Sequence, residues 1–554
     1  MQRVVPAPAG TNTCSHESVS GLSRPTWSQA SPNLPACIPV CNRCAQDRHD
    51  AASEPGNTQQ AYTPSNRNSP DGTPPMYDKT ELERVLLLQR SSFLQQGDAN
   101  LQQRVSRTSR MALALLENID VLSDTLCADY GWRHASVSKA FEGMSWVKDI
   151  EHTLAELAQW MAPRPVPGGF VQAKPKGVVG IMGAWNFPLT LTFQPAMAAL
   201  AAGNRVMLNF PEQHPRTGAL LREIFNARFD ESEVTLFNGD LATATQFATL
   251  KLDHLFFTGS PEVGSLVSEA AAKNLVPVTL ELGGKNPVVV ARDADLALAA
   301  TRIASTRLVN GGQVCLCPDY VFIPEEKFEE FVGHLQAQMR SVSGDYLHNP
   351  AMVPLVNERN YARVLALIGD ATALGAQKLE TLPESQLQHL PDPATRRIAP
   401  TLLIDTPENA RINHMEIFGP VLVLKRYAHV QEAIDYIAHH PSPLAAYWYG
   451  EDSADFRNFL AHTRSGGVTR NDGFVHGLLP DTPFGGVGRS GSGAYHGRTG
   501  FDTFTHYRSV ANGAGEHGMA DAFVNGAMLT ADAEATINAA VATAISGFRA
   551  GAGR

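Results

Sequence analysis

The sequence predicts an α/β protein built on parallel sheets. Short apolar runs of strand length alternate with segments that carry apolar residues at helix spacing, from about residue 177 to residue 439. Such alternation is typical of parallel sheets with helices on both faces. The 554 residues are 43% hydrophobic and 18% charged, which is the composition of a globular protein long enough for several domains.

Residues 1–75 differ from the rest of the chain. They are rich in Pro, Ser, Asn and Thr, and we expect them to be disordered. A regular sequence begins at Met76, so a mis-assigned start codon upstream of it is an alternative. The C-x3-C-x2-C spacing in this segment could hold an iron–sulfur cluster or a weak zinc site, but no barrel-like alternation follows, and we favour neither. The segment holds four of the seven cysteines: Cys14, Cys37, Cys41 and Cys44.

Helical periodicity then runs from Asp78 to about Met161, within which Leu101–Leu126 and Ala140–Trp160 each carry the pattern of a helix. Prolines and glycines across 162–169 end the last helix. Residues 170–176 predict an extended arm.

Two series of strands and helices follow. The first ends with a strand that places Glu281 at its end, and ligands in such sheets bind at the carboxyl ends of strands. A glycine-rich stretch covers 466–510, and the Ala-rich tail allows a weak helix at 531–548. We expect strands at 177–183, 205–210, 234–238, 254–257, 276–282, 287–291, 319–323, 400–404 and 421–427, and helices at 189–202, 218–229, 242–250, 264–274, 296–310, 327–342, 362–374 and 430–439.

Charge and cysteine content narrow the function classes. The formal net charge of −10 argues against nucleic acid or an anionic membrane as a main partner. We find no membrane-spanning run and no secretory leader pattern. Seven cysteines in this length do not make a disulfide framework, so we expect a reducing cytoplasm.

Glu281 and Cys315 form the first candidate catalytic pair. Glu281 opens the run Glu-Leu-Gly-Gly-Lys, and Cys315 follows two glycines in Asn-Gly-Gly-Gln-Val-Cys-Leu-Cys-Pro. Burial of the carboxylate would make it a base, and glycines let backbone N–H groups approach a reacting atom. The pair suggests covalent catalysis with a later hydrolytic step. A buried structural cysteine between two turns is the alternative.

Asn186 and a glycine turn add two further candidates. Asn186 lies between a buried strand and a helix, where its amide could stabilise an oxyanion with the N–H of Cys315 or simply cap the helix. Gly259, Ser260 and Gly264 form a Gly-Ser-x-x-x-Gly turn that opens a helix. Such a turn could receive a pyrophosphate, or it could be an ordinary strand–helix connection.

Glu416 and Phe418 lie together in the turn Glu-Ile-Phe-Gly-Pro. The carboxylate could hold ribose hydroxyls, and the ring could pack against a nicotinamide. A solvated turn beside a core Phe is the alternative.

Taken in order, these motifs resemble the aldehyde dehydrogenase superfamily over about residues 76–510. The sequence runs through Gly-Ala-Trp-Asn-Phe-Pro, Phe-Thr-Gly-Ser, Glu-Leu-Gly-Gly-Lys, Gly-Gln-x-Cys, Glu-Ile-Phe-Gly-Pro and Pro-Phe-Gly-Gly-Val-Gly. The endings at 488–497 and 501–506, with Gln194-Pro195, are similar to the class 3 and coniferyl-aldehyde branch.

The resemblance implies an NAD(P)-dependent oxidation of an aldehyde to its acid. Cys315 would attack the aldehyde carbon, Asn186 would donate to the oxyanion, and Glu281 would activate the water that hydrolyses the thioester. Glu212 would bond the adenosine ribose and disfavour a 2′-phosphate. No metal site is expected. The implied NAD(P)-binding residues are Trp185, Asn209, Glu212, Gly239, Gly259, Ser260, Gly264, Glu416 and Phe418.

Three positions depart from the family pattern. Asn209 stands where a Lys usually contacts the adenosine ribose, which leaves the choice between NAD and NADP open. Cys317 replaces the usual Ala or Ser and could capture an oxidised Cys315 as a disulfide, or could be a small buried thiol. Arg470 puts a cation where small or apolar residues are common.

The expected architecture is a Rossmann-like cofactor domain, an α/β catalytic domain and a small oligomerisation arm, as in the aldehyde dehydrogenase fold. By resemblance the arm pairs two subunits into a homodimer. The boundaries are 76–161 with 177–282 for the NAD(P)-binding domain, 162–176 with 496–510 for the arm, 283–495 for the catalytic domain, and 511–554 for a weakly structured tail.

Two other functions stay open from the sequence alone. A cofactor-independent thiol hydrolase or acyltransferase would need a base beside Cys315, which no motif supplies. A non-catalytic protein that keeps the fold is supported only by Asn209. The expected substrate is an aromatic aldehyde such as coniferyl aldehyde, or a medium-chain aliphatic one.

Overall fold

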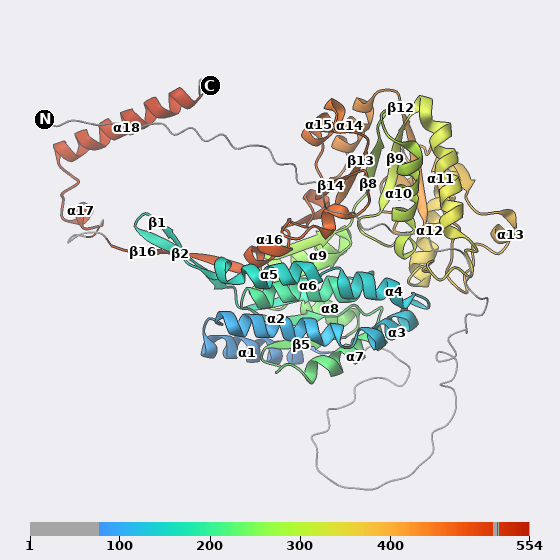
Figure 1. Ribbon diagram of the computed structural model, residues 1–554. Coiled ribbons are helices and arrows are strands. Elements are labelled where there is room, and N and C mark those ends of the chain that lie inside the picture. Colours follow the sequence, from blue (N-terminus) through green and yellow to red (C-terminus); the bar gives the residue numbers. More distant parts are fainter. Residues whose placement is uncertain (1–76, 514–517, 519, 553–554) are drawn as a thin grey trace, which may run out of the picture. The chain divides into compact units, whose positions relative to one another are not determined.

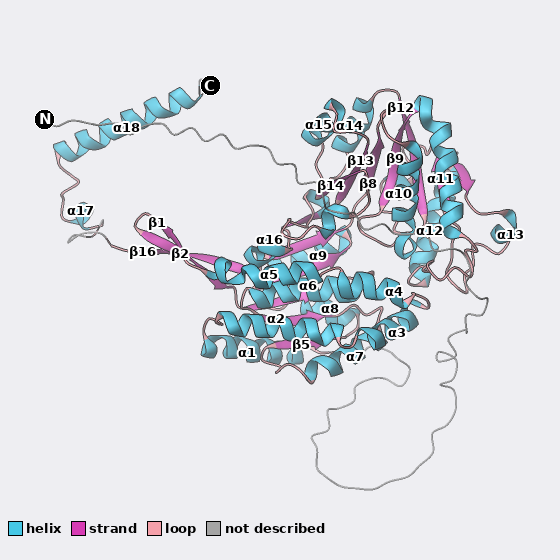
Figure 2. Cartoon of the chain, in the orientation of Figure 1, coloured by secondary structure: helices cyan, strands magenta, loops and turns pink. Residues whose placement is uncertain are grey.

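The computed structural model describes residues 77–513, 518 and 520–552, with two main sheets, a small third sheet and many helices (Figures 1 and 2). The expectations for residues 1–75, for the cysteines at 14, 37, 41 and 44 and for Met76 lie outside the described residues. The α/β fold class predicted from the alternating pattern is confirmed.

A six-stranded sheet forms the first α/β unit. Five strands run parallel, and a two-residue strand pairs antiparallel with Glu281 and its neighbour at one edge. In order across the sheet they are β15 (Gly491–Ser492), β7 (Val278–Leu282), β6 (His254–Gly259), β3 (Val178–Met182), β4 (Arg205–Asn209) and β5 (Val234–Phe237).

Alternate residues of these strands join different helices, because side chains on a strand point to opposite faces. Val179 and Leu208 belong to the core cluster that includes α2 (Leu101–Leu116), α5 (Val147–Met161), α6 (Pro188–Ala201) and α7 (Pro215–Asn226). Val178 and Met207 belong to the cluster with α1 (Lys79–Gln96), α8 (Leu241–Phe247) and α9 (Pro261–Ala272). The parallel strands are therefore covered on both faces.

A seven-stranded sheet forms the second unit. Only its first strand pairs antiparallel with its neighbour. The order is β10 (Gln377–Glu380), β11 (Thr401–Ile404), β12 (Val421–Tyr427), β9 (Pro318–Pro324), β8 (Asn286–Val290), β13 (Ala445–Tyr449) and β14 (Gly467–Arg470).

The second sheet is also covered on both faces. Val288 and Val321 pack in the cluster with α10 (Leu296–Leu308) and α11 (Phe328–Ser343). Val289 and Phe322 pack with α12 (Glu358–Ala373), α14 (Val430–His439) and α15 (Ala454–His462). Buried residues of both units belong to one continuous cluster.

The third sheet has three antiparallel strands (Figure 2). Its strands are β1 (Arg164–Val166), β2 (Gly169–Pro175) and β16 (Thr505–Ala511), and they bring the predicted arm residues 162–176 beside the C-terminal stretch. The short helix α16 (Gly497–Thr503) precedes β16 and packs on α5 and α6.

The C-terminal stretch contains α17 (Asp521–Val524) and the 22-residue helix α18 (Ala531–Ala552), which has no buried residue. The sequence predicted only a weak helix there. None of the described helices combines the length and hydropathy needed to cross a bilayer.

Several elements differ from the sequence-based expectation. The long helix expected from Leu101 is two helices, α2 and α3 (Ile119–Tyr130), which meet at Asn118. The helix expected from Ala140 begins as α4 (Ala135–Ser138) and a π-helical turn at Lys139–Met144. The expectation also omitted β13, α15 and β14. The remaining helical turns are α13 (Glu384–Leu387) and 3₁₀ turns at Val309–Gly312, Glu325–Lys327, Arg411–Asn413, Val475–Leu478 and Gly488–Ser490.

Candidate active site

Cys315 lies in the loop between α10 and β9. The helix ends because Asn310 and Gly311 adopt left-handed φ values of 52° and 66°, a conformation open to Asn and Gly. A Cβ at Gly312 would lie 2.3 Å from the carbonyl oxygen of Gly419, so the chain passes where only glycine fits. Asn286 Nδ2 donates to the Cys315 carbonyl oxygen at 2.7 Å and fixes the loop.

Asn186 follows β3 at its carboxyl end and is 3% exposed. Its Nδ2 donates to the carbonyl oxygen of Gln313 at 3.3 Å, which places the amide two residues from Cys315 in the nucleophile loop. An amide N–H in this position can also donate to an oxyanion formed at a carbon bonded to the Cys315 sulfur. Asn186 therefore contacts the loop that carries Cys315.

Glu281 lies near the end of β7 and is 1% exposed. Both carboxylate oxygens are buried without a hydrogen-bond partner. Burial, and then the negative charge of Glu416, raise its pKa to about 8. A carboxyl group with this pKa can accept a proton from water at mildly alkaline pH.

Glu416 lies against the glycine turn that follows β7. A Cβ at Gly283 would meet Glu416 Oε2 at 2.1 Å, so the glycine leaves room for this carboxylate. Burial and the charge of Asp319 raise the pKa of Glu416 to about 8, while the backbone N–H of Gly284 opposes that shift. The two carboxylates therefore share one buried region beside the nucleophile loop.

The Cys315 thiol is partly exposed and packs against the apolar core. Burial, followed by the charges of Glu281 and Glu416, raises its pKa well above the usual range. The thiol is therefore protonated at neutral pH, and its proton must leave before the sulfur attacks a carbonyl carbon.

The predicted cofactor residues gather at the carboxyl ends of β3, β4 and β6. Trp185 and Phe418 meet edge to face, with ring centroids 5.3 Å apart, and Phe418 has a φ of 48° in its tight turn. Asn209 ends β4 with Oδ1 buried and without a hydrogen-bond partner. Ser260 caps α9 by accepting from the N–H of Val263 at 3.3 Å.

These features fit a dinucleotide. Asn209 Oδ1 is a buried acceptor that a ribose hydroxyl would satisfy, and the N-terminus of the 12-residue α9 favours a pyrophosphate. Glu212 is half-buried beside Gln213, whose Nε2 donates to Glu212 Oε1 at 2.9 Å. It follows β4 directly, where the adenosine ribose of a nucleotide on this sheet edge would lie.

The three predicted glycines serve close packing. A Cβ at Gly264 would lie 2.7 Å from Leu282 Cδ2, so this glycine lets α9 approach β7. A Cβ at Gly239 would meet the Thr243 side chain at 2.4 Å, and one at Gly259 the Phe257 ring at 2.4 Å. Of these, Gly264 faces the core, and its part in a cofactor site is to set the distance between α9 and β7.

A buried network that the sequence did not reveal holds Asn186 in place. The backbone oxygen of Asn186 accepts from Tyr130 Oη at 2.6 Å and from Arg133 Nη1 at 3.1 Å. Arg133 pairs with Glu142, whose Oε2 accepts the N–H of Leu189 at 2.9 Å in the first turn of α6. These residues lie in a helical stretch where Arg and Glu suggest a solvated surface, so no sequence pattern indicates their burial.

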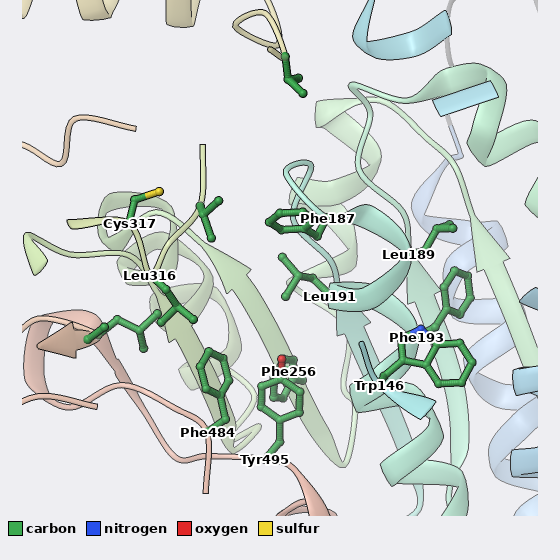
Figure 3. Close-up of a cluster of buried hydrophobic side chains, with 14 of the residues drawn as sticks. Trp146, Phe187, Leu189, Leu191, Phe193, Phe256, Leu316, Cys317, Phe484 and Tyr495 are labelled. Atoms are coloured by element: carbon green, nitrogen blue, oxygen red, sulfur yellow. The ribbon is translucent and has the colours of Figure 1, made fainter. Parts of the chain in front are cut away.

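An apolar wall flanks the nucleophile loop. Figure 3 shows Phe187 and Leu191 at the start of α6 in one cluster with Leu316, Phe484 and Tyr495. The Phe484 and Tyr495 rings meet edge to face at 5.7 Å. Leu316 adjoins Cys315 in sequence, so the wall suits an aromatic or aliphatic group attached to the reacting carbon.

Cys317 and Arg470 have surroundings that differ from those of the reacting groups. The Cys317 thiol is 3% exposed and donates to the Thr306 carbonyl oxygen of α10 at 3.2 Å. Arg470 is exposed at the end of β14 and lines a cavity of about 310 Å³ together with Arg302 and His476. Its guanidinium lies 5.8 Å from the Phe456 ring centroid.

Comparison with known proteins gives concordant results. Residues 51–510 match the model of the aldehyde dehydrogenase family. The chain is 40% identical over 436 residues to the coniferyl aldehyde dehydrogenase of a Pseudomonas species, covering 78% of this chain and 90% of that protein. It is 34% identical to the dimeric NADP-preferring aldehyde dehydrogenase of Rattus norvegicus, covering 76% and 92%.

The fold also matches a solved structure. The substrate-bound state of Staphylococcus aureus AldH superposes with a TM-score of 0.73 at 30% sequence identity. The match covers 80% of this chain and 95% of that one.

Proposed function

We propose that the residues around Cys315 carry out the reaction of this chain, which belongs to the aldehyde dehydrogenase family. The reaction oxidises an aldehyde to its carboxylic acid with NAD or NADP. The observation that carries the proposal is the meeting of Cys315, Asn186 and Glu281 from three separate segments beside one apolar wall. Each residue then has one step of the reaction.

Cys315 is the nucleophile. After its proton leaves to solvent, the sulfur forms a bond to the aldehyde carbon, and the carbonyl oxygen becomes an oxyanion. Asn186 Nδ2 donates to that oxyanion, and the backbone contacts from Tyr130 and Arg133 keep the amide in position. A preformed donor of this kind stabilises charge that develops only as the bond forms.

Trp185, Asn209, Glu212, Ser260, Glu416 and Phe418 would hold the dinucleotide. When bound, the nicotinamide supplies the acceptor for the hydride that leaves the substrate carbon, and the product on Cys315 is a thioester. Glu416 stands beside the glycine turn after β7, where its carboxylate would accept from ribose hydroxyls.

Glu281 is the base of the second half of the reaction. Its carboxylate accepts a proton from water while the water oxygen bonds to the thioester carbon. The carbon–sulfur bond then breaks, and the carboxylic acid and the Cys315 thiol are released. Because neither Glu281 oxygen has a protein partner, the carboxylate is free to bond this water.

The substrate class is an aromatic aldehyde of the coniferyl type, with medium-chain aliphatic aldehydes as slower substrates. Phe187 and Phe484 belong to the apolar cluster that Cys315 packs against, beside which a planar ring on the substrate would lie. The relative named for coniferyl aldehyde supports the same choice. A cofactor-independent hydrolase gains no support, because the ends of β4 and β6 beside the site carry features that fit a dinucleotide.

An aldehyde panel with NAD and NADP, run on the parent chain and on Cys315→Ala, tests this function. We expect coniferyl and related aromatic aldehydes to give the highest kcat/KM, and Cys315→Ala to form no NADH or NADPH. Cys127→Ala is the matched control, since Cys127 is another free thiol, on α3. Aldehyde-dependent cofactor reduction retained without Cys315 would overturn the assignment.

Two further proposals are that the chain forms a homodimer through the arm and that it works in the cytoplasm. Strand β16 pairs along one edge with β2, and most of its side chains are exposed. Such a sheet is marginal alone, and a second subunit would cover it. The three cysteines of the described residues are free thiols, as expected in a reducing compartment. Light scattering of the purified chain tests the dimer.

A further inference from the structure

A cluster on the second α/β unit combines two histidines and a carboxylate. One nitrogen each of His414 and His440 and one oxygen of Glu408 all lie within 4.8 Å of one another. We propose that Glu408, His414 and His440 bind a divalent transition-metal ion of the zinc class. Two imidazoles and one carboxylate form a ligand set that such ions accept, with a fourth position left for water.

The hydrogen bonds of the two rings fix which nitrogens are available. His440 Nδ1 lies 2.7 Å from the carbonyl oxygen of Tyr436, and His414 Nε2 lies 2.7 Å from that of Glu408. A carbonyl oxygen only accepts, so these nitrogens carry the hydrogen. His440 Nε2 and His414 Nδ1 are left with lone pairs in the neutral rings. Backbone carbonyls orient metal-binding histidines in this way.

The contact between His440 and Glu408 then calls for a cation. His440 Nε2 and Glu408 Oε1 are 3.4 Å apart, and in the neutral ring both atoms are acceptors. Either a proton on Nε2 or a metal ion between them resolves this repulsion. Ligand atoms about 2.0–2.1 Å from a tetrahedral zinc ion lie about 3.3–3.4 Å apart. The His440–Glu408 pair has this spacing, and the His414 ligand atom lies within 4.8 Å of both.

The remaining groups hold the carboxylate and the ring without occupying these atoms. Lys425 Nζ lies 3.8 Å from Glu408 Oε2, and Tyr436 Oη lies 3.5 Å from the same oxygen. The His440 ring stacks on Tyr436, with centroids 3.9 Å apart. Oε1 is therefore the oxygen turned toward His440, while the ammonium group neutralises Oε2.

The position of the cluster gives the ion a consequence. Glu408 and His414 lie in the connection from β11 to Glu416, and His414 precedes Glu416 by two residues. His440 caps the end of α14. An ion bound by all three residues would tie this connection to α14 and restrain the turn that carries Glu416 and Phe418.

Cobalt titration of the full chain tests the site, with Co²⁺ as the spectroscopic substitute for zinc. The parent chain is compared with His440→Asn and Glu408→Gln, each of which replaces a ligating group by a neutral amide that binds such an ion poorly. His439→Asn is the matched control, because His439 is exposed on the same helix and contacts the Asp435 carbonyl oxygen at 2.6 Å. Circular dichroism without metal checks that all four chains are folded.

We expect the parent and His439→Asn to bind one more equivalent of Co²⁺ than His440→Asn and Glu408→Gln. The difference spectrum should lack a thiolate charge-transfer band, which separates this site from ions held by cysteines. Zinc should raise the melting temperature of the first pair more than that of the second. Equal stoichiometry in all four chains would mean that Glu408 and His440 form an ion pair only. A thiolate band in the difference spectrum would also overturn the assignment. Neither readout depends on aldehyde oxidation.

Discussion

Glu281 on β7 lies directly opposite Gly491 on β15 in an antiparallel pair. Gly491 has a φ of 145°, and a Cβ there would lie 2.2 Å from the carbonyl oxygen of Leu280. The glycine lets β15 pair closely with the edge of β7 at the residue that carries this buried carboxylate. Burial, and then the charge of Glu416, raise the pKa of Glu281 to about 8.

Gly491→Ala should therefore damage both stability and turnover. A non-glycine residue in this backbone region costs about 1–3 kcal/mol, and the clash with Leu280 adds to it. Displacing β15 would also shift Glu281 on the paired strand β7 away from the Cys315 loop, so kcat should fall. Urea denaturation and kcat measurements check this. Gly369→Ala is the control, since nothing lies near a Cβ there within α12, and it should be neutral or slightly stabilising. Wild-type stability of Gly491→Ala would contradict the prediction.

Turnover should rise with pH through about 8. Glu281 acts as a base only when deprotonated, so below its pKa of about 8 the protonated fraction is inactive. The rising limb should be visible in kcat wherever hydrolysis of the thioester limits the rate. Glu281→Gln should lose about 10²–10⁴-fold in kcat, the usual contribution of a general base, while the first turnover still releases NADH.

Glu416→Gln should move the rising part of the kcat–pH profile, which reports deprotonation of Glu281, to lower pH. The negative charge of Glu416 is one cause of the raised pKa of Glu281, so its removal favours the carboxylate form. The same change should raise KM for the cofactor. Stopped-flow pH profiles of kcat under saturating cofactor separate the two effects. A limb that stays near pH 8 in Glu416→Gln would show that the two carboxylates do not interact.

Glu142→Ala should destabilise the fold strongly. The Arg133–Glu142 ion pair is fully buried, with an N–O distance of 2.5 Å, and truncation leaves Arg133 charged and unpaired by Glu142. Breaking a buried pair in this way costs about 3–5 kcal/mol. Because Arg133 also donates to the Asn186 carbonyl oxygen, kcat/KM should fall in the molecules that remain folded. Glu151→Ala is the control, because Glu151 is exposed on α5, and an equal effect of both changes would contradict the prediction.

The sequence allowed prediction of the strands that carry chemistry, because their glycine turns and apolar runs are local features. Asn186 and Glu281 were placed at strand ends for this reason, and both lie there. The burial of charged side chains could not be predicted in this way. Arg133 and Glu142 pair across a π-helical turn, and the pattern of their segment is that of an ordinary surface helix.

Strand β13 shows a second limit of the sequence. Its five residues are all buried, and it lies between β8 and the edge strand β14 of the seven-stranded sheet. A run of two alanines and three aromatic residues has neither alternation nor helix spacing, so its assignment depends on neighbours far away in the chain. Likewise, the Asn286 contact that fixes the Cys315 loop joins segments 29 residues apart.

Asn209→Lys should strengthen nucleotide binding, and more for NADP than for NAD. The Asn209 Oδ1 atom is buried without a partner at the end of β4, so the position faces the expected ribose site. A lysine there would add a cation that attracts a 2′-phosphate, and we expect a gain of about tenfold in NADP affinity. Calorimetric titration measures it. Gln213→Lys adds the same charge after the end of β4 and should raise NADP affinity less. An equal gain in affinity for both variants would mean that the ribose lies elsewhere.

Cys317→Ala should leave the reaction intact. The Cys317 thiol donates to the Thr306 carbonyl oxygen and is packed in the core, so it serves the fold beside the nucleophile loop (Figure 3). We expect kcat within about twofold of the parent and a stability loss of about 1 kcal/mol, the usual worth of one hydrogen bond. Peroxide-treated parent and variant should regain the same fraction of activity with dithiothreitol. If Cys317 instead captured an oxidised Cys315 as a disulfide, only the parent would be protected and would recover, because the variant has no thiol to form the bond.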